Sequence, residues 1–253
     1  MLPYFSLTSL SLGPITLHVW GLLVALGFLV GTLMAGWMAK RRGLKTEVIY
    51  DIAPWLAIAG MVGGRLGHVL FYEPAYFLQN PLEIFAIWHG GLSVYGGIFA
   101  CIAVGLLYLR HKKVDVFAYS DVLIFGLPFG KIFGRIGCFL IHDHPGTLTD
   151  FVLGIKYPDG EVRHDLGLYL AMNAFVLSIL FLWLARKERP TGTYIVVFAL
   201  WYGVARFFLD FLRVVDVRYF GLTPGQYFSL MLVVFGIAMA LWITDRAKKR
   251  KGR

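Results

Sequence analysis

Seven apolar stretches, each about 20 residues long, constrain the fold more than any other feature of this sequence. They cover roughly residues 16–38, 53–72, 91–109, 119–141, 166–185, 192–212 and 225–244. A helix needs about 20 mainly apolar residues to cross the hydrocarbon core of a bilayer. With 58% hydrophobic and 15% charged residues, the chain has too much apolar surface for an ordinary soluble domain. The sequence therefore predicts an all-α polytopic membrane protein with seven transmembrane helices.

The basic residues between these stretches are distributed very unevenly. Sixteen Lys and Arg residues follow the first, third, fifth and seventh stretches, whereas the alternate loops carry only four. Because Lys and Arg concentrate in cytoplasmic loops, this asymmetry predicts that the N-terminus faces out and the C-terminus faces in. The net charge of +9 then reflects topology and anionic lipid, and nucleic acid is not predicted as a partner.

The largest outward loop is expected to form a small cap. Within residues 142–165 the run FVLGIKYP is followed by Asp159 and Gly160, which is typical of a short β-hairpin. The prolines and aromatics of residues 73–88 suggest a short helix at the membrane interface. Since no internal repeat or linker is evident, we expect a single transmembrane domain over residues 1–253, with an extracytoplasmic cap over approximately 142–165.

Four basic residues remain inside the predicted spans: Arg65, Lys131, Arg135 and Arg206. Each would cost about 2.5–3.5 kcal/mol at the bilayer centre, so we expect them to face a polar interior. Glycines around Arg65 and Arg135 allow close approach and would let an anionic headgroup reach an arginine. Because the guanidinium fork suits phosphate, the pattern favours a lipid phosphate as ligand, reached from the outer side.

Arg206 and Asp210 are four residues apart and are predicted to share a helix face as an ion pair, with either a direct or a structural role. Candidate acid–base residues also gather in the outward segments, namely His68, His89, Tyr95, His142, Asp143, His144, Asp150, His164 and Asp165. The run His142-Asp143-His144 resembles a metal site but lacks a third ligand at a defined spacing. No metal and no cofactor is therefore predicted. Both cysteines, Cys101 and Cys138, fall in apolar stretches, which argues against a disulfide framework.

Several motifs occur in a fixed order along the chain: GGRLGHVLFYE (63–73), HGGLSVYGG (89–97), FGRIGCF (133–139), YGVARFFLDFLRVVD (202–216) and PGQYFSL (224–230). By these motifs the chain resembles the prolipoprotein diacylglyceryl transferase family over nearly its whole length. The resemblance implies a multi-pass enzyme of the bacterial cytoplasmic (inner) membrane, with its active site open toward the extracytoplasmic side. Its partners would be phosphatidylglycerol and the lipobox of a prolipoprotein signal peptide. The diacylglyceryl group would move to the lipobox cysteine thiol, releasing glycerol phosphate.

The resemblance also implies roles for individual residues. Arg135, preceded by Gly134 in the signature, would hold the headgroup phosphate. Arg206 would bind the leaving phosphate, with Asp210 orienting it. Arg65 would support the headgroup pocket. Asp143 falls where the family has an acid after its signature.

The chain departs from the family pattern close to the chemistry. Tyr95 stands at the position of the family's catalytic histidine, Cys138 at the signature asparagine and Trp20 at a tyrosine of the first span. His89 or a histidine of the outer loop would then serve as general base. Cys138 is expected either as a small apolar core residue or as a nucleophile paired with a histidine. These departures leave two alternatives open: a related enzyme with the same donor and another acceptor, or a non-catalytic phospholipid-binding protein.

Overall fold

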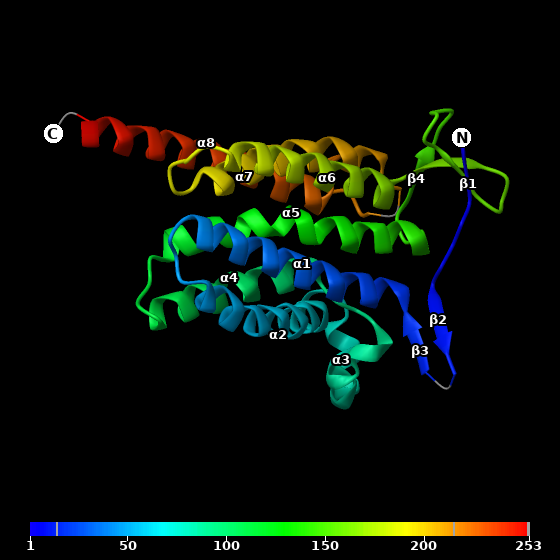
Figure 1. Ribbon diagram of the computed structural model, residues 1–253. Helices are drawn as coiled ribbons and strands as arrows, with labels where there is room; N and C mark the ends of the chain where they lie inside the picture. Colours follow the sequence, from blue (N-terminus) through cyan, green and yellow to red (C-terminus); the bar gives the residue numbers. More distant parts are fainter. Residues whose placement is uncertain (14, 215, 252–253) are drawn as a thin grey trace. The chain divides into compact units, whose positions relative to one another are not determined.

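The computed structural model describes residues 1–13, 15–214 and 216–251, and most of them are helical. The chain divides into two compact units. In Figure 1 the ribbon is coloured by residue number, from blue at the N-terminus to red at the C-terminus. Unit 1 comprises residues 1–35 and 120–253, and unit 2 comprises residues 36–119. The single domain expected over 1–253 stays a prediction.

Eight α-helices and three short 3-10 helices form the framework of the described residues. They are α1 (Val19–Arg41), α2 (Thr46–Phe71), α3 (Pro74–Gln79), η1 (Pro81–Phe85), η2 (Ile87–His89), α4 (Val94–His111), α5 (Val116–Ile141), α6 (Leu166–Ala185), α7 (Thr193–Leu209), η3 (Asp210–Leu212) and α8 (Pro224–Lys251). The short helices α3, η1 and η2 occupy the 73–88 segment where a short helix was expected.

Six described helices are long and apolar enough to cross a membrane: Val19–Arg41, Val94–His111, Val116–Ile141, Leu166–Ala185, Thr193–Leu212 and Pro224–Arg246. Large apolar side chains remain exposed on them, such as Phe99, Leu107 and Val234, as expected of helices that face lipid. The polytopic all-α architecture is confirmed to this extent. The predicted span 53–72 coincides with α2 up to Phe71. This helix has 26 residues but is not among the six, and it carries Arg65, His68 and four glycines.

Glycines let two helices of unit 1 approach closely. On α1 the pair is Gly27 and Gly31, and on α5 it is Gly126 and Gly130. A Cβ added at Gly31 would lie 3.2 Å from the Gly126 carbonyl oxygen, and one at Gly27 would collide with the Gly130 carbonyl. Small residues four apart on both helices are a common basis of helix association in membranes. This contact positions α5, which carries the signature arginine.

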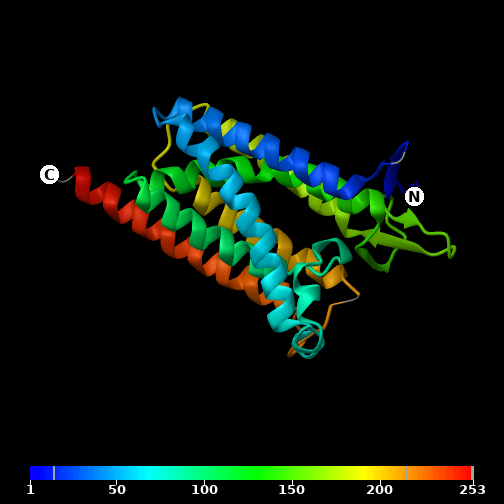
Figure 2. The same ribbon diagram turned by 90° about the horizontal axis from the view of Figure 1, so that it is seen from below.

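An aromatic core joins α5, α6 and α7 in the same unit. The Phe125 ring centroid lies 5.7 Å from that of Phe181 and 4.9 Å from that of Tyr194. The buried Asp121 carboxylate accepts a hydrogen bond from the Ile195 backbone N–H at 2.9 Å, in the first turn of α7. Helix α8 then runs along α7, as both views show (Figure 1 and Figure 2).

The cap of unit 1 is a small sheet. Its strands are β1 (Leu2–Pro3), β5 (Ile155–Lys156), β6 (Val162–Asp165) and β4 (Pro145–Leu148), in that spatial order. Strands β5 and β6 form the expected hairpin, with Gly160 at φ +87° in the turn. Two features were not predicted: β1 pairs in parallel with β5, and β2 (Ser9–Leu12) forms a separate hairpin with β3 (Ile15–His18). Figure 2 shows the blue N-terminal segment beside the green hairpin.

Unit 2 is built around the packing of α2 against α4. A Cβ at Gly63 would meet the Gly96 carbonyl at 2.6 Å, and one at Gly67 would lie 2.9 Å from the Gly96 Cα. The glycines beside Arg65 were expected to make room for a headgroup. Instead, Gly63 and Gly67 face α4 and allow the two helices to touch.

Candidate active site

The predicted Arg206–Asp210 ion pair is present at the end of α7. Arg206 Nη2 lies 3.0 Å from Asp210 Oδ1, and the Asp210 side chain is fully buried. The other carboxylate oxygen, Asp210 Oδ2, accepts a hydrogen bond from the Thr223 hydroxyl at 3.0 Å. The carboxylate is therefore held on both oxygens, so the orientation of Arg206 is fixed by its partner.

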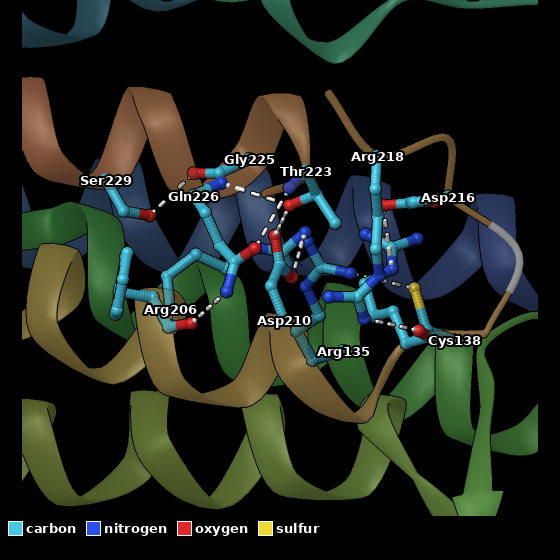
Figure 3. A network of polar contacts seen from close by, with 12 residues as sticks. Arg135, Cys138, Arg206, Asp210, Asp216, Arg218, Thr223, Gly225, Gln226 and Ser229 are labelled. Atoms are coloured by element: carbon cyan, nitrogen blue, oxygen red, sulfur yellow. Dashed lines mark hydrogen bonds and ion pairs between the residues drawn. The ribbon is translucent and has the colours of Figure 1, made fainter. Parts of the chain in front are cut away.

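Thr223, which donates this hydrogen bond to Asp210, lies at the start of α8. Gln226 N–H donates to Thr223 Oγ1 at 3.1 Å, and Thr223 N–H donates to Gln226 Oε1 at 2.9 Å. This reciprocal pattern is a capping box, which satisfies N–H groups that the first turn of a helix leaves unpaired. A Cβ at Gly225 would collide with the Asp210 carboxylate. The TPGQ sequence thus both starts α8 and encloses Asp210 (Figure 3).

Two cations on α5 face the Arg206 region. Lys131 and Arg135 lie one turn apart on α5, as Tyr202 and Arg206 do on α7. Lys131 Nζ lies 3.4 Å from the Tyr202 ring centroid, and the charges of both Arg135 and Arg206 act on these two side chains. We call Lys131, Arg135, Tyr202, Arg206 and Asp210 the arginine cluster. Tyr202 was not predicted as a site residue, and its only signal in the sequence is its place four residues before Arg206.

The end of α5 brings three further polar groups together. Arg135 Nη1 donates to Cys138 Sγ at 3.7 Å, and Cys138 is buried. Helix α5 ends at Ile141 because His142 takes the left-handed conformation, with φ +50°, a common way to end a helix. The reversed chain places Asp143 and His144 beside Cys138, with the three ligand atoms within 4.8 Å of one another.

His142 itself is committed to the cap. Its Nδ1 lies 2.6 Å from Asp165 Oδ2, and its Nε2 lies 3.1 Å from the Phe5 carbonyl oxygen. Both ring nitrogens of His142 are thus engaged by acceptors of the cap and of the N-terminal segment. Tyr157 O–H also donates to Asp165 at 3.2 Å, and burial and Asp165 raise the pKa of Tyr157. His142 is therefore a structural residue here, which removes it from the candidate bases.

The other two outer-loop histidines are only partly buried. Burial lowers the pKa of His144 below the usual histidine value, although Asp143 beside it acts in the opposite direction. Burial likewise lowers the pKa of His164, whose Nδ1 lies 2.7 Å from the Tyr169 hydroxyl oxygen. Of the three, only His144 lies in the group with Cys138 and Asp143.

Trp20 and Gly134 complete the unit 1 candidates. Trp20, at the start of α1, packs on α5, since a Cβ at Gly137 would lie 3.2 Å from Trp20 Cδ1. It also interacts with the Cys138 side chain. Gly134 has more space, because an added Cβ would lie 3.9 Å from its nearest neighbour, Val24. Helix packing therefore explains Gly137 but not Gly134.

In unit 2, Arg65 is buried and fully hydrogen-bonded. Its five N–H groups donate to five backbone carbonyls, those of Glu83, Ile84, Ala86, Gly90 and Gly91. The guanidinium also lies over the Phe77 ring, 5.0 Å from its centroid. A guanidinium has five N–H donors in all, so Arg65 organises the 83–91 segment through its backbone.

The two remaining candidates of unit 2, His89 and Tyr95, lie in and just after this segment. His89 Nδ1 lies 2.9 Å from Glu83 Oε2, with both side chains open to solvent. Tyr95 lies in the first turn of α4, whose N-cap Ser93 accepts a hydrogen bond from Gly96 N–H at 3.3 Å. Of the predicted site residues, the structure thus brings together seven in unit 1: Trp20, Gly134, Arg135, Cys138, Asp143, Arg206 and Asp210. Arg65, His89 and Tyr95 belong to unit 2.

These features define a polytopic helical membrane protein with arginines held among its apolar helices. A profile of the family described as "Prolipoprotein diacylglyceryl transferase" matches residues 8–242. Two phosphatidylglycerol–prolipoprotein diacylglyceryl transferases are similar over most of their length. That of Nitrosomonas europaea is 36% identical over 252 residues, 95% of this chain and 90% of the relative. That of Janthinobacterium sp. is 37% identical over 251 residues, 92% and 93% of the two chains.

A third relative of the same name, from Geobacter sulfurreducens, is 34% identical over 254 residues, 96% of this chain and 97% of its own length. The chain therefore belongs to the prolipoprotein diacylglyceryl transferase family. The resemblance inferred from the sequence motifs is confirmed.

Proposed function

We propose that this chain transfers the diacylglyceryl group of phosphatidylglycerol to the lipobox cysteine thiol of prolipoproteins and releases glycerol phosphate. The observation that carries the proposal is the arginine cluster. Arg135 and Arg206, which match the family's motifs, lie in one polar network of unit 1 that also contains Asp210. The relatives named above are phosphatidylglycerol–prolipoprotein diacylglyceryl transferases.

The arginines act on the leaving group. The thiolate sulfur of the acceptor attacks the glyceryl carbon that is bonded to the phosphate oxygen. The new C–S bond forms as the C–O bond breaks, and the electron pair moves onto the departing glycerol phosphate. Negative charge develops on that phosphate, where Arg135 and Arg206 stabilise it. Donors oriented in advance are most effective in such a low-dielectric site, and Asp210 provides this orientation for Arg206.

The remaining predicted residues take supporting roles in this proposal. The phospholipid donor is proposed to bind beside the arginine cluster, next to Cys138, Asp143, Trp20 and Gly134. Arg65 shapes the 83–91 segment. His89 and Tyr95 are proposed as acid–base groups. Because Glu83 occupies Nδ1 of His89, Nε2 is left to accept a proton, as in other carboxylate-oriented histidines.

We also infer that α2 forms a seventh span, with the N-terminus outside, the C-terminus inside and the active site open to the extracytoplasmic side. The distribution of basic residues, sixteen against four, supports this orientation. In spheroplasts, single cysteines in the 43–45 turn between α1 and α2 and in the 156–160 turn should differ in labelling. A membrane-impermeant maleimide should reach only the latter, and the reverse result would overturn the orientation.

The reaction is tested with purified protein in detergent micelles, phosphatidylglycerol and a lipobox peptide. Glycerol phosphate release should require the peptide, and its mass should rise by one diacylglyceryl group. The matched control is the same peptide with serine in place of the lipobox cysteine, which should give no release. Release with the serine peptide would indicate phospholipid hydrolysis instead, and no release with either peptide would overturn the proposal.

A further inference from the structure

Cys138, Asp143 and His144 combine a thiol, a carboxylate and an imidazole at one point of unit 1. Their ligand atoms all lie within 4.8 Å of one another, and His144 Nε2 lies 3.7 Å from Asp143 Oδ2. Ligands of a tetrahedral zinc ion are separated by about 3.4–3.6 Å, given their usual bond lengths. Asp143 is exposed and His144 half-buried, so both side chains have room to rotate toward this separation.

The hydrogen bond of His144 involves Nδ1 and leaves Nε2 available to bind a metal ion. His144 Nδ1 lies 2.8 Å from the Asp143 carbonyl oxygen, which can only accept. In the tautomer with the proton on Nδ1, the Nε2 lone pair is available to a cation, and Nε2 lies 3.7 Å from Asp143 Oδ2. Histidines that bind metals are commonly oriented in this way, with the second ring nitrogen donating to a backbone carbonyl.

The charges of the group also suit a divalent cation. A Cys138 thiolate and the Asp143 carboxylate together balance a charge of +2. Arg135 Nη1 donates to Cys138 Sγ at 3.7 Å, so the sulfur already faces a positive charge that a bound cation would have to displace or share. The neighbouring Arg213 is itself paired with Asp216, its Nε lying 3.1 Å from Asp216 Oδ2. The local positive charge is thus already partly neutralised.

We propose that Cys138, Asp143 and His144 bind a zinc ion or a similar borderline-soft divalent cation, with a fourth position left open. Thiolate and imidazole ligands select such ions over magnesium or calcium, and three protein ligands with an open position are typical of catalytic zinc sites. The sequence predicted no metal because the His142–His144 run lacked a third ligand. The fold removes His142 from this group and supplies Cys138 in its place.

The role of the ion rests on the proposed transferase function, although the site itself does not. The acceptor thiol takes the open position and loses its proton to solvent, since a thiol coordinated to zinc is deprotonated. Its sulfur then attacks the glyceryl carbon, and the electron pair of the broken C–O bond leaves with glycerol phosphate. In this proposal the ion, in place of His89, activates the acceptor thiol. Tyr95 is poorly suited to that role, because a tyrosine has a reference pKa of about 10.

A direct nucleophilic role for Cys138 fits less well. Attack by its own sulfur would join the diacylglyceryl group to Cys138 through a thioether. A second thiol would then have to break that stable C–S bond to complete the transfer. A ligand role needs no such step.

The test uses the full chain in detergent micelles, stripped with a chelator and titrated with Co²⁺. A thiolate-to-cobalt charge-transfer band should appear and saturate at one equivalent. The matched control is Cys101→Ser, since Cys101 lies in unit 2 and donates only to the Leu56 carbonyl at 3.3 Å. This variant should keep the band, whereas Cys138→Ser should lose it. His144→Gln removes the imidazole ligand and should weaken binding by at least the roughly 10–100-fold that losing a residue which orients a ligand costs. Because His144 is half-exposed, this substitution should leave the fold intact.

The outcomes separate the site from the function. A wild-type band that Cys138→Ser retains, or no band at all, overturns the metal site, whatever the transferase assay gives. A specific band in a protein without peptide-dependent glycerol phosphate release supports the site and overturns the proposed function. Release that a chelator abolishes and Zn²⁺ restores supports both. Release that is insensitive to the chelator, although the band is present, overturns the role of the ion in thiol activation.

Discussion

Arg65 in unit 2 and Arg206 in unit 1 show two different uses of an arginine among apolar helices. Both side chains are largely buried. Arg65 donates all five of its N–H groups to backbone carbonyls of the 83–91 segment. Arg206 is held by a carboxylate that Thr223 fixes from the other side. Saturation by carbonyls makes Arg65 part of the framework, whereas the single fixed partner of Arg206 suits a group that is oriented for a ligand.

The difference lies in what each arginine would lose on meeting a phosphate. Arg65 would have to abandon buried carbonyls, and each unpaired polar group costs about 1–3 kcal/mol. Arg206 can keep Asp210 on one edge of its guanidinium and present other N–H groups to a phosphate, because the fork has five donors. The buried charge of Arg65 is therefore stabilised by backbone carbonyls of the fold. That of Arg206 is stabilised by an ion pair that leaves N–H groups for a ligand.

The largest expected effect is at Arg135. Arg135→Ala should lower peptide-dependent glycerol phosphate release by about 10²–10³-fold, as expected for the loss of one oriented donor, while the thermal midpoint in detergent changes little. Arg135→Lys should recover part of the rate, since it restores charge without the fork. The control is Arg163→Ala, which breaks an exposed pair with Asp159 and should leave the rate unchanged. Full activity in Arg135→Ala would contradict a phosphate-binding role.

Substitution of Arg65 should lower the stability of the fold. Arg65→Lys replaces five donors by three, leaves carbonyls unpaired and should destabilise the protein by about 2 kcal/mol, measured by denaturant unfolding in micelles. Arg110→Lys is the matched control, because Arg110 is exposed at the end of α4 in the same unit. If Arg65→Lys kept its stability but lost affinity for phosphatidylglycerol, Arg65 would belong with Arg206 and the contrast between the two would fail.

Much of the fold and of this site could be predicted, because the features concerned depend on residues close together in the sequence. Apolar length indicated six of the seven predicted spans, and the four-residue spacing of Arg206 and Asp210 placed both on one face. Asp159-Gly160 identified the hairpin turn. These features depend on neighbouring residues, so a single sequence is enough to find them.

The remaining features depend on residues that only the fold brings together. The role of Arg65 requires carbonyls from η1 to Gly91, and no side-chain pattern marks a carbonyl. The group of Cys138 with Asp143 and His144 depends on a left-handed turn at His142, a non-glycine residue in which that conformation is uncommon. Pairing of β1 with β5 joins the two sequence segments of unit 1, residues 1–35 and 120–253, and a two-residue strand is too short for its alternation to be recognised.

A smaller effect is expected at Asp210. Asp210→Asn keeps an oxygen for the Thr223 hydroxyl but removes the charge that holds Arg206, so the rate should fall by about 10-fold with little change in fold. Asp159→Asn, in the exposed pair with Arg163, is the control and should not alter the rate. An equal rate in Asp210→Asn would mean that Arg206 needs no charged partner, and that Asp210 serves only to anchor α8.

The smallest effect concerns His164 in the cap of unit 1, where a titratable group is only partly buried. Burial lowers the pKa of His164, so the folded protein holds the neutral form more strongly than the unfolded chain, whose histidine pKa is about 6.5. Stability is therefore present above about pH 6.5 and is lost as the pH falls through the lower folded pKa. His164→Gln can keep the contact with Tyr169 and should show a smaller drop in thermal midpoint between about pH 7.5 and about pH 5.5. Parallel curves for the two proteins would show that acid acts on the cap elsewhere. A steeper curve for the variant would mean that the fold favours protonated His164.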